Sequence, residues 1–238
     1  MNLEALVARH ARLWELKRRL EAEGRRPQPP RVDGIDYGPC LLISREHASG
    51  GDAIARLAGQ RLGWPVYDRE LVDQIAAHAH VRKQLIERID ERSRFAWQAF
   101  RSALASNGIE PETYLGHLES VVRALGHHGD VVLVGRGAHR ILPSLCALRV
   151  RIVAPPNLRR DRLAAERGID PASAAAEIHD TDEARASFHR QAFHRDVQTP
   201  SDYDLVLNTE AVDAPTAVEV VLRLMESKLG VRPTPPTA

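Results

Sequence analysis

The sequence is poor in lysine, and its charges nearly cancel. Among 33 basic residues only Lys17, Lys83 and Lys228 are lysines, so arginine carries almost all of the positive charge. Arginine suits bidentate binding of phosphate, although codon usage alone would produce the same bias. Because 32 acidic residues leave a formal net charge of +1, no overall field indicates a nucleic-acid or membrane partner, and we expect neither.

Cysteines and long apolar runs are also scarce. Cys40 and Cys146 lie far apart in the chain and form no C-x-x-C pair, which argues against a zinc site or a disulfide framework. No apolar run approaches the roughly 20 residues of a membrane-spanning helix. The N-terminus carries acidic residues and lacks the apolar core of a signal peptide. We therefore expect a soluble, cytoplasmic protein.

Residues 1–24 are predicted to form an amphipathic helix. Its leucine stripe consists of Leu6, Leu13, Leu16 and Leu20. The Pro-rich residues 25–39 cannot continue a helix and are predicted to be a linker. Three roles for the helix stay open: packing against the main body, forming a homodimer, or lying on a membrane surface. The linker also predicts that the main domain folds without the helix.

Residues 40–230 alternate short apolar runs with amphipathic stretches. We expect strands at 40–43, 64–67, 131–134, 148–154 and 204–207, with helices between them and a mostly helical insertion at about 69–127. The tail 231–238 is expected to be disordered. Strands that alternate with helices predict an α/β fold with a parallel sheet. Ligands of such folds bind at the carboxyl ends of the strands, so the loops there are the ones to inspect.

The first of these loops reads Ser44-Arg45-Glu46-His47-Ala48-Ser49-Gly50-Gly51-Asp52 and joins a strand to a helix. Small residues allow backbone N–H groups to turn inward, and the helix N-terminus adds partial positive charge. The sequence therefore predicts a phosphate-binding loop. The alternative is a tight glycine-rich turn without a ligand.

The third strand ends in Gly135-Arg136-Gly137. An arginine between two glycines at the end of a buried strand is poorly explained by packing, and its fork can hold two phosphate oxygens. A solvated arginine in a turn is the alternative. A dinucleotide-binding fingerprint is not supported, because Arg140 stands where its third glycine belongs and Ala154-Pro155 where its acid belongs.

Several arginines follow the fourth strand, on two successive predicted helices. They are Arg159, Arg160, Arg162, Arg185 and Arg190. Together they could close over phosphates as a lid, at about 156–195, although each one alone is more often a solvated helix residue. Asp68 follows the second strand. It could accept a hydrogen bond from a nucleotide, or cap the helix that begins at Arg69.

Taken in order, these loops resemble the cytidylate-kinase-like family, a branch of the P-loop nucleoside-monophosphate kinases. The resemblance is carried by four segments: LLISREHASGGDAIARLAGQRLGWPVYDRELVDQIA, VVLVGRGAHRIL, VRIVAPPNLRRDRLAAERG and DYDLVLNTEAVD. It implies a P-loop NTPase-type three-layer fold with a five-stranded parallel sheet, a helical monophosphate-binding insertion and an arginine-bearing lid. It also implies a cytoplasmic kinase that uses ATP and Mg²⁺, with CMP or dCMP as the acceptor.

The resemblance and the positions of the loops together predict roles for residues. The catalytic arginines would be Arg45, Arg136, Arg159, Arg162 and Arg185. The nucleotide-binding residues would be Ser44, His47, Ser49, Gly50, Gly51, Asp52, Ala53, Asp68, Gly135 and Gly137. Ser49 to Gly51 would lie along the donor phosphates. Asp68 would face the acceptor, and Arg136 would bind its phosphate. Asp52 would be the metal ligand.

Two departures distinguish this sequence from cytidylate kinases, which carry G-x-x-x-x-G-K-[ST] in the first loop and an Asp after the arginine of the third strand. Here Gly51 stands at the lysine, Asp52 at the Ser or Thr, and Gly137 at the Asp. Arg45 is a candidate replacement for the missing cation. Three functions stay open: a kinase with a variant loop, a nucleotide-binding regulatory module without turnover, and a kinase of another small metabolite.

Overall fold

The structure is a computed structural model that describes residues 3–23, 30–32, 34–78 and 114–232. Its centre is a five-stranded sheet in the order β4-β5-β3-β6-β7, with every neighbouring pair parallel. The strands are β3 (Cys40–Arg45), β4 (Val66–Tyr67), β5 (Val131–Val134), β6 (Ala147–Val153) and β7 (Leu205–Asn208). The predicted α/β fold with a five-stranded parallel sheet is therefore confirmed.

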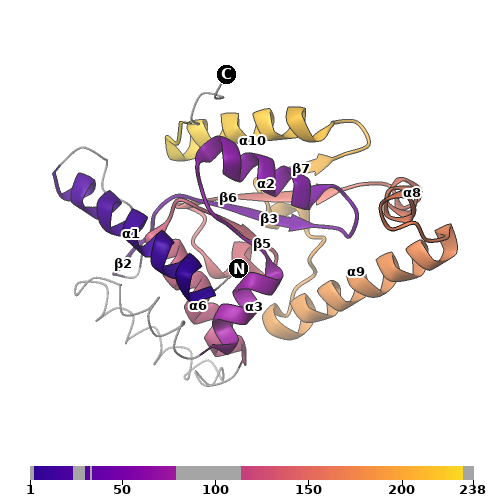
Figure 1. Cartoon of the computed structure of the whole chain (residues 1–238), viewed down its shortest axis with the longest axis horizontal. Helices are drawn as coiled ribbons and strands as arrows, with labels where there is room; N and C mark the ends of the chain where they lie inside the picture. The colour runs from indigo at the N-terminus through magenta and orange to yellow at the C-terminus, as the bar shows by residue number, and fades with distance from the viewer. Residues whose placement is uncertain (1–2, 24–29, 33, 79–113, 233–238) are drawn as a thin grey trace.

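Helices cover both faces of the sheet and make three layers (Figure 1). On one face lie α2 (Gly51–Leu62) and α10 (Ala214–Leu229); on the other lie α1 (Leu3–Ala22), α3 (Arg69–Ala77), α6 (Tyr114–His128) and the short α7 (Ala138–Ile141). Side chains of β3 alternate between the two cores. Cys40 and Leu42 pack on the α1 side, while Leu41 and Ile43 pack on the α2 side.

The ends of the helices follow from local sequence. Gly63 ends α2 in the left-handed conformation, with φ of 67°. Asp68 caps α3 by accepting a hydrogen bond from the backbone N–H of Leu71. The helix α8 (Pro156–Arg167) begins with a proline, and α9 (Pro171–Phe193) begins after the capping residue Asp170.

The N-terminal helix packs against the main body through Trp14 and Lys17. Trp14 is 4% exposed and stacks on His128 with ring centroids 3.9 Å apart. Lys17 donates to the backbone carbonyl of His128. Leu13 and Leu16 are 53% and 56% exposed, so these two leucines of the predicted stripe are not on the buried face. This packing argues against a helix that can be removed without cost.

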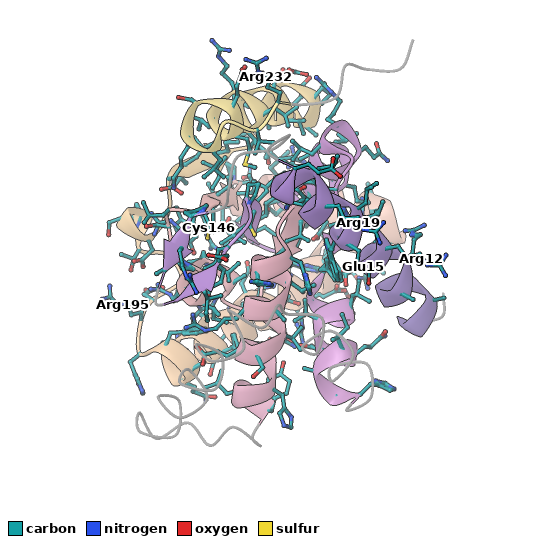
Figure 2. All side chains as sticks on the ribbon, turned by 90° about the vertical axis from the view of Figure 1, so that its left-hand side faces the viewer. Arg12, Glu15, Arg19, Cys146, Arg195 and Arg232 are labelled. Atoms are coloured by element: carbon teal, nitrogen blue, oxygen red, sulfur yellow. The ribbon has the colours of Figure 1, made fainter. Side chains whose placement is uncertain are left out.

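The outer side of α1 is charged. Figure 2 shows Arg12, Glu15 and Arg19 there, and all three are exposed. No helix among the described residues is long and apolar enough to cross a membrane. A two-stranded antiparallel pair, β1 (Arg31–Val32) with β2 (Ile35–Asp36), lies within the predicted linker and was not expected. Most of the predicted helical insertion and residues 233–238 of the predicted tail lie outside the described residues.

Candidate functional site

A small cavity of about 70 Å³ lies where β3, β5 and β6 end. Its lining is strongly basic and includes Arg45, Arg69, Arg136, Arg151 and Arg185, together with Ser44, Gly135, Phe188 and His189. These residues come from three strand ends, from α3 and from α9, which are far apart in the sequence. The carboxyl edge of the parallel sheet gathers them, as the alternating order of strands and helices predicts.

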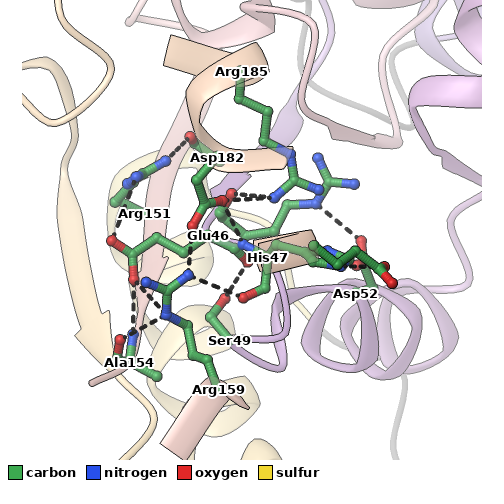
Figure 3. Close-up of polar contacts among 12 residues, drawn as sticks. Glu46, His47, Ser49, Asp52, Arg151, Ala154, Arg159, Asp182 and Arg185 are labelled. Carbon is green, nitrogen blue, oxygen red and sulfur yellow. Dashed lines mark hydrogen bonds and ion pairs between the residues drawn. The ribbon is translucent and has the colours of Figure 1, made fainter. Parts of the chain in front are cut away.

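The segment 44–52, called loop 44–52 below, turns from β3 into α2 beside this cavity (Figure 3). Ala48 and Gly50 have positive φ angles of 57° and 84°, which make the turn tight. The helix α2 starts without a side-chain cap, so the first N–H groups of the helix have no side-chain partner there. Ser49 is fully buried and donates its hydroxyl to the carbonyl of Glu46, so its hydroxyl braces the loop.

Arg45 fills the space beside Gly51. A Cβ on Gly51 would lie 2.6 Å from the Cβ of Arg45 and 3.0 Å from its Cγ, so no larger residue fits beside this arginine. From there the guanidinium reaches across the site: its Nε donates to Asp52 Oδ1 at 3.0 Å. Its Nη1 would lie 2.8 Å from a Cβ on Gly135. One arginine thus spans the start of α2 and the end of β5.

The segment after β5 has an unusual backbone. Gly135, Arg136 and Gly137 have φ angles of 82°, 51° and 66°, and such a conformation is uncommon for an arginine. The Arg136 guanidinium is held by both carboxylate oxygens of Asp73, and lies 5.3 Å from the ring centroid of Phe188. A side chain on Gly137 would overlap the ring of Phe193. Both glycines that depart from the kinase pattern, 51 and 137, therefore face bulky side chains of this chain.

The two helices α8 and α9 dock onto loop 44–52. Arg159 is buried, and donates to the carbonyls of Ala154 and His47 and to Asp182 Oδ2. Asp182 Oδ1 accepts the backbone N–H of His47 at 2.8 Å. Arg185 Nη1 donates to the carbonyl of Arg45 at 3.1 Å. The predicted lid thus contacts the loop directly, and Figure 3 shows these residues converging on it.

Other predicted residues take different positions. Arg162 donates twice to Thr209, whose hydroxyl in turn donates to the carbonyl of Ser49. It therefore braces the loop from the side of β7 and does not line the cavity. Arg160 pairs with Asp161 and Arg190 with Glu183, all at exposed positions. Ala53 follows Asp52 in the first turn of α2, and Asp68 caps α3 at the edge of the sheet.

Positive charge exceeds negative charge around the cavity. Six arginines, those at 45, 69, 136, 151, 159 and 185, have four carboxylates within 4.0 Å among the described residues: Glu46, Asp52, Asp73 and Asp182. Burial, reinforced by the nearby Arg45, lowers the pKa of Arg185 to about 10. Crowded, partly buried cations of this kind favour the binding of an anion, because an anion offsets their mutual repulsion.

Sequence reasoning missed several residues of this site. Arg151 is buried, donates to Ser44 Oγ at 2.8 Å and lines the cavity. A charged residue within an apolar strand is a signal in the sequence that could have identified Arg151. In the sheet β6 pairs with β3, and Arg151 lies opposite Ser44. Arg69 and Asp73 gave no such signal, because they look like ordinary helix residues.

The described residues of this site offer few side chains that could bind a metal ion. Among the described residues no group of three or more His, Cys, Asp or Glu side chains could hold a metal ion. Asp52 is a single carboxylate, 53% exposed and paired with Arg45. Since Mg²⁺ at nucleotide sites is held by one or two carboxylates plus phosphate oxygens and water, Asp52 fits a metal that arrives with a nucleotide.

Comparison with known proteins agrees with this geometry. The sequence model of the cytidylate kinase-like family matches residues 41–211, which include loop 44–52, the Gly135–Gly137 segment and the helices α8 and α9. The chain belongs to the cytidylate kinase-like family. Two curated relatives are named cytidylate kinase. The one from Methanothermobacter thermautotrophicus is 26% identical over 73% of this chain and 97% of its own length. The one from Methanopyrus kandleri is 25% identical over 53% of this chain and 76% of its own.

Among solved structures, an uncharacterised protein from Eubacterium ventriosum has a similar fold. Its TM-score is 0.64 at 20% identity, over 79% of this chain and 98% of that one. The likeness concerns the fold alone. It extends across nearly the whole of that protein, which is shorter than this chain.

Proposed function

We propose that this protein transfers the terminal phosphoryl group of ATP to CMP, dCMP or a similar nucleoside monophosphate, at the arginine-lined cavity. The observation that carries the proposal is the surplus of arginine over carboxylate at the carboxyl edge of the sheet, next to an uncapped helix N-terminus. Phosphoryl transfer needs little covalent help from a protein. It needs positioned positive charge, because charge spreads over the transferred oxygens in the transition state.

In this proposal the donor phosphates lie along loop 44–52, where the N–H groups at the start of α2 face them. An oxygen of the acceptor's phosphate attacks the terminal phosphorus of ATP. The bond from that phosphorus to the bridging oxygen breaks, and ADP leaves with the electron pair of that bond. The chain's contribution is to hold the two phosphates in line and to stabilise the transferred group with arginines.

In this proposal Arg45 takes the role that the loop lysine of cytidylate kinases has at the position of Gly51. The two residues compete for one space, because the stem of Arg45 lies where a side chain on Gly51 would begin. Its guanidinium still reaches Asp52 and the end of β5. The planar guanidinium of arginine is always charged and can donate to two phosphate oxygens at once. It can therefore replace a lysine that neutralises one phosphate oxygen. The change from lysine to glycine is thus compensated within the same loop.

Mg²⁺ would be held by Asp52 together with the phosphates. It would neutralise charge on the donor phosphate oxygens. Because Asp52 is paired with Arg45 in the protein without ligands, the carboxylate is already held close to where those phosphates are proposed to bind. Asp52 and Arg45, which are in direct contact, would then act on the donor side by side.

The acceptor would bind between α3 and α9. Arg136 lies there with its guanidinium between Asp73 and the ring of Phe188, and Arg69 lines the same cavity. Arg136 is proposed to take the acceptor's phosphate, and Asp68 to face its sugar or base. Tyr114 donates to Asp73 at 2.7 Å, which keeps that carboxylate oriented toward Arg136.

A nucleotide-binding regulatory module without turnover is the second candidate. This candidate is favoured by the ion pairs that the arginines already form with carboxylates of the protein, above all the pair of Arg136 with Asp73. The two functions separate in a direct experiment. Calorimetry with ATP should give binding that ADP competes for, and CMP should bind to the same protein. An assay for ADP release in the presence of both then separates a kinase from a binding module. Absence of heat and of thermal shift at millimolar ATP would overturn both.

A further inference from the structure

A carboxylate of α9 sits directly on loop 44–52. Asp182 Oδ1 accepts the backbone N–H of His47 at 2.8 Å, and its other oxygen accepts from Arg159 Nη1 at 2.5 Å. Arg185 Nη1 lies 3.5 Å from Oδ1. A loop amide and two arginines therefore converge on one anion that belongs to the chain itself (Figure 3).

This set of donors is the set that an oxyanion ligand would use. A phosphate at the loop needs inward N–H groups and arginine forks, because both donate to negatively charged oxygens. Asp182 supplies two such oxygens in a fixed place. It is only 28% exposed at the side chain, so its charge is little screened by water.

We propose that Asp182 is a built-in competitor of the donor phosphates. In the protein without nucleotide it satisfies the His47 N–H and neutralises Arg159 and Arg185, and it holds α9 down on the loop. A donor phosphate binds by displacing this carboxylate and taking over its arginines. The contact is autoinhibitory: it lowers the affinity for free anions and couples nucleotide binding to a movement of α9. This inference rests on the proposed function of the same site.

A purely structural clamp is the alternative, and the same helix offers a contact for comparison. Glu177 Oε1 lies 3.0 Å from His47 Nε2 and also joins α9 to the loop. Glu177 touches neither the loop amide nor Arg159, so its removal loosens the clamp without removing the competing anion. Asp180, exposed on α9, is a control for the loss of one negative charge on the helix.

The test is a calorimetric titration of the full-length protein with pyrophosphate at fixed ionic strength. Asp182→Asn keeps the shape and removes the charge. It should bind pyrophosphate about tenfold more tightly than the wild type, because no carboxylate at position 182 then competes with pyrophosphate for Arg159 and Arg185. Asp180→Asn should stay within twofold of the wild type, and Glu177→Gln should show no gain. Should Asp182→Asn fail to fold, Asp182→Ser is the second variant, with the same expectation.

The outcomes separate the two proposals. Equal or weaker binding by folded Asp182 variants, beside clear binding by the wild type, overturns the competitor role and leaves the proposed function intact. An equal gain in Glu177→Gln overturns it too, because loosening of α9 would then explain the effect. If no form of the protein binds pyrophosphate or ATP, the proposed function fails and this inference fails with it. Binding by Asp182→Asn alone supports the inference in its strongest form.

Discussion

The side chain of Arg45 occupies the space that a side chain on Gly51 would need, with the Cβ of Arg45 only 2.6 Å from the place of a Cβ at position 51. The glycine and the arginine therefore belong together. A loop that had merely lost its lysine would leave that space empty. Here a cation enters from the preceding strand and ends between α2 and β5. In the proposed function, Arg45 supplies the positive charge that the loop lysine supplies in cytidylate kinases.

This relationship predicts the effect of Gly51→Ala. Alanine normally stabilises a helix relative to glycine, but here its methyl group would meet an atom fixed to the backbone of Arg45. We expect the free energy of unfolding to fall by about 1–3 kcal/mol, as for other overpacked sites. Urea denaturation measures this. In an Arg45→Gly background the same substitution should cost much less, and an equal cost there would contradict the proposed overlap.

Arg136→Ala should weaken binding of CMP by about tenfold or more, because a charged bidentate contact to its phosphate is lost. The fold should persist, since Arg136 lies on a loop and its partner Asp73 is part-exposed and can be solvated. Calorimetry gives the affinity, and circular dichroism gives the fold. Arg190→Ala, an exposed arginine on the lid, serves as the matched control. An unchanged CMP affinity would remove Arg136 from the acceptor site.

Stability should fall in mild acid because of two buried histidines. His139 and His189 stack with ring centroids 5.3 Å apart. Burial lowers the pKa of His189 to about 4 and that of His139 to about 2, from an ordinary value of 6.5. The unfolded chain therefore binds protons that the folded chain rejects, so stability declines as pH falls from about 6.5 toward 4.

The size of this acid effect is about 1–2 kcal/mol per histidine between pH 7.5 and pH 5. Urea midpoints at the two pH values measure it, and His189→Asn should make the dependence shallower. The exposed His179 offers the control substitution. The wild type must be folded at both pH values. A urea midpoint that does not move between them would show that the two rings take up protons in the native state as readily as in the unfolded chain.

Trp14→Ala should destabilise the protein by about 3 kcal/mol, because it empties a buried site beside His128. Leu16→Ala, at an exposed position on the same helix, should change stability by less than about 0.5 kcal/mol. Thermal and urea denaturation compare the two. If the two substitutions change stability equally, or not at all, α1 is not held by Trp14 and is separable from the main domain, as the Pro-rich segment predicts.

Much of the fold was predictable because its signals are local. Apolar runs such as 131–134 mark buried strands, and Gly63 and Asp68 mark helix ends, each through backbone geometry of a few residues. The positions of Arg45 and Arg136 beside one cavity followed from their places at the ends of parallel strands. These inferences needed no knowledge of how the elements pack.

The rest depended on contacts between distant segments. Nothing local shows that Asp182 reaches the amide of His47, or that Phe193 fills the space at Gly137, since the partners are 135 and 56 residues apart. Leu13 and Leu16 were misleading, because α1 packs through Trp14 and Lys17, whose partners His128 and Asp130 are supplied only by the tertiary structure.

The most direct test of the account is an ADP-release assay over the common nucleoside monophosphates, with CMP and dCMP first, on the wild type and Arg45→Ala. We predict turnover by the wild type, and a loss of roughly 100-fold in Arg45→Ala with a much smaller change in ATP affinity. Arg56→Ala, exposed on α2, should behave as the wild type. Turnover unaffected by Arg45→Ala would contradict the role given to this arginine, and no turnover with any monophosphate beside clear ATP binding would contradict the kinase itself.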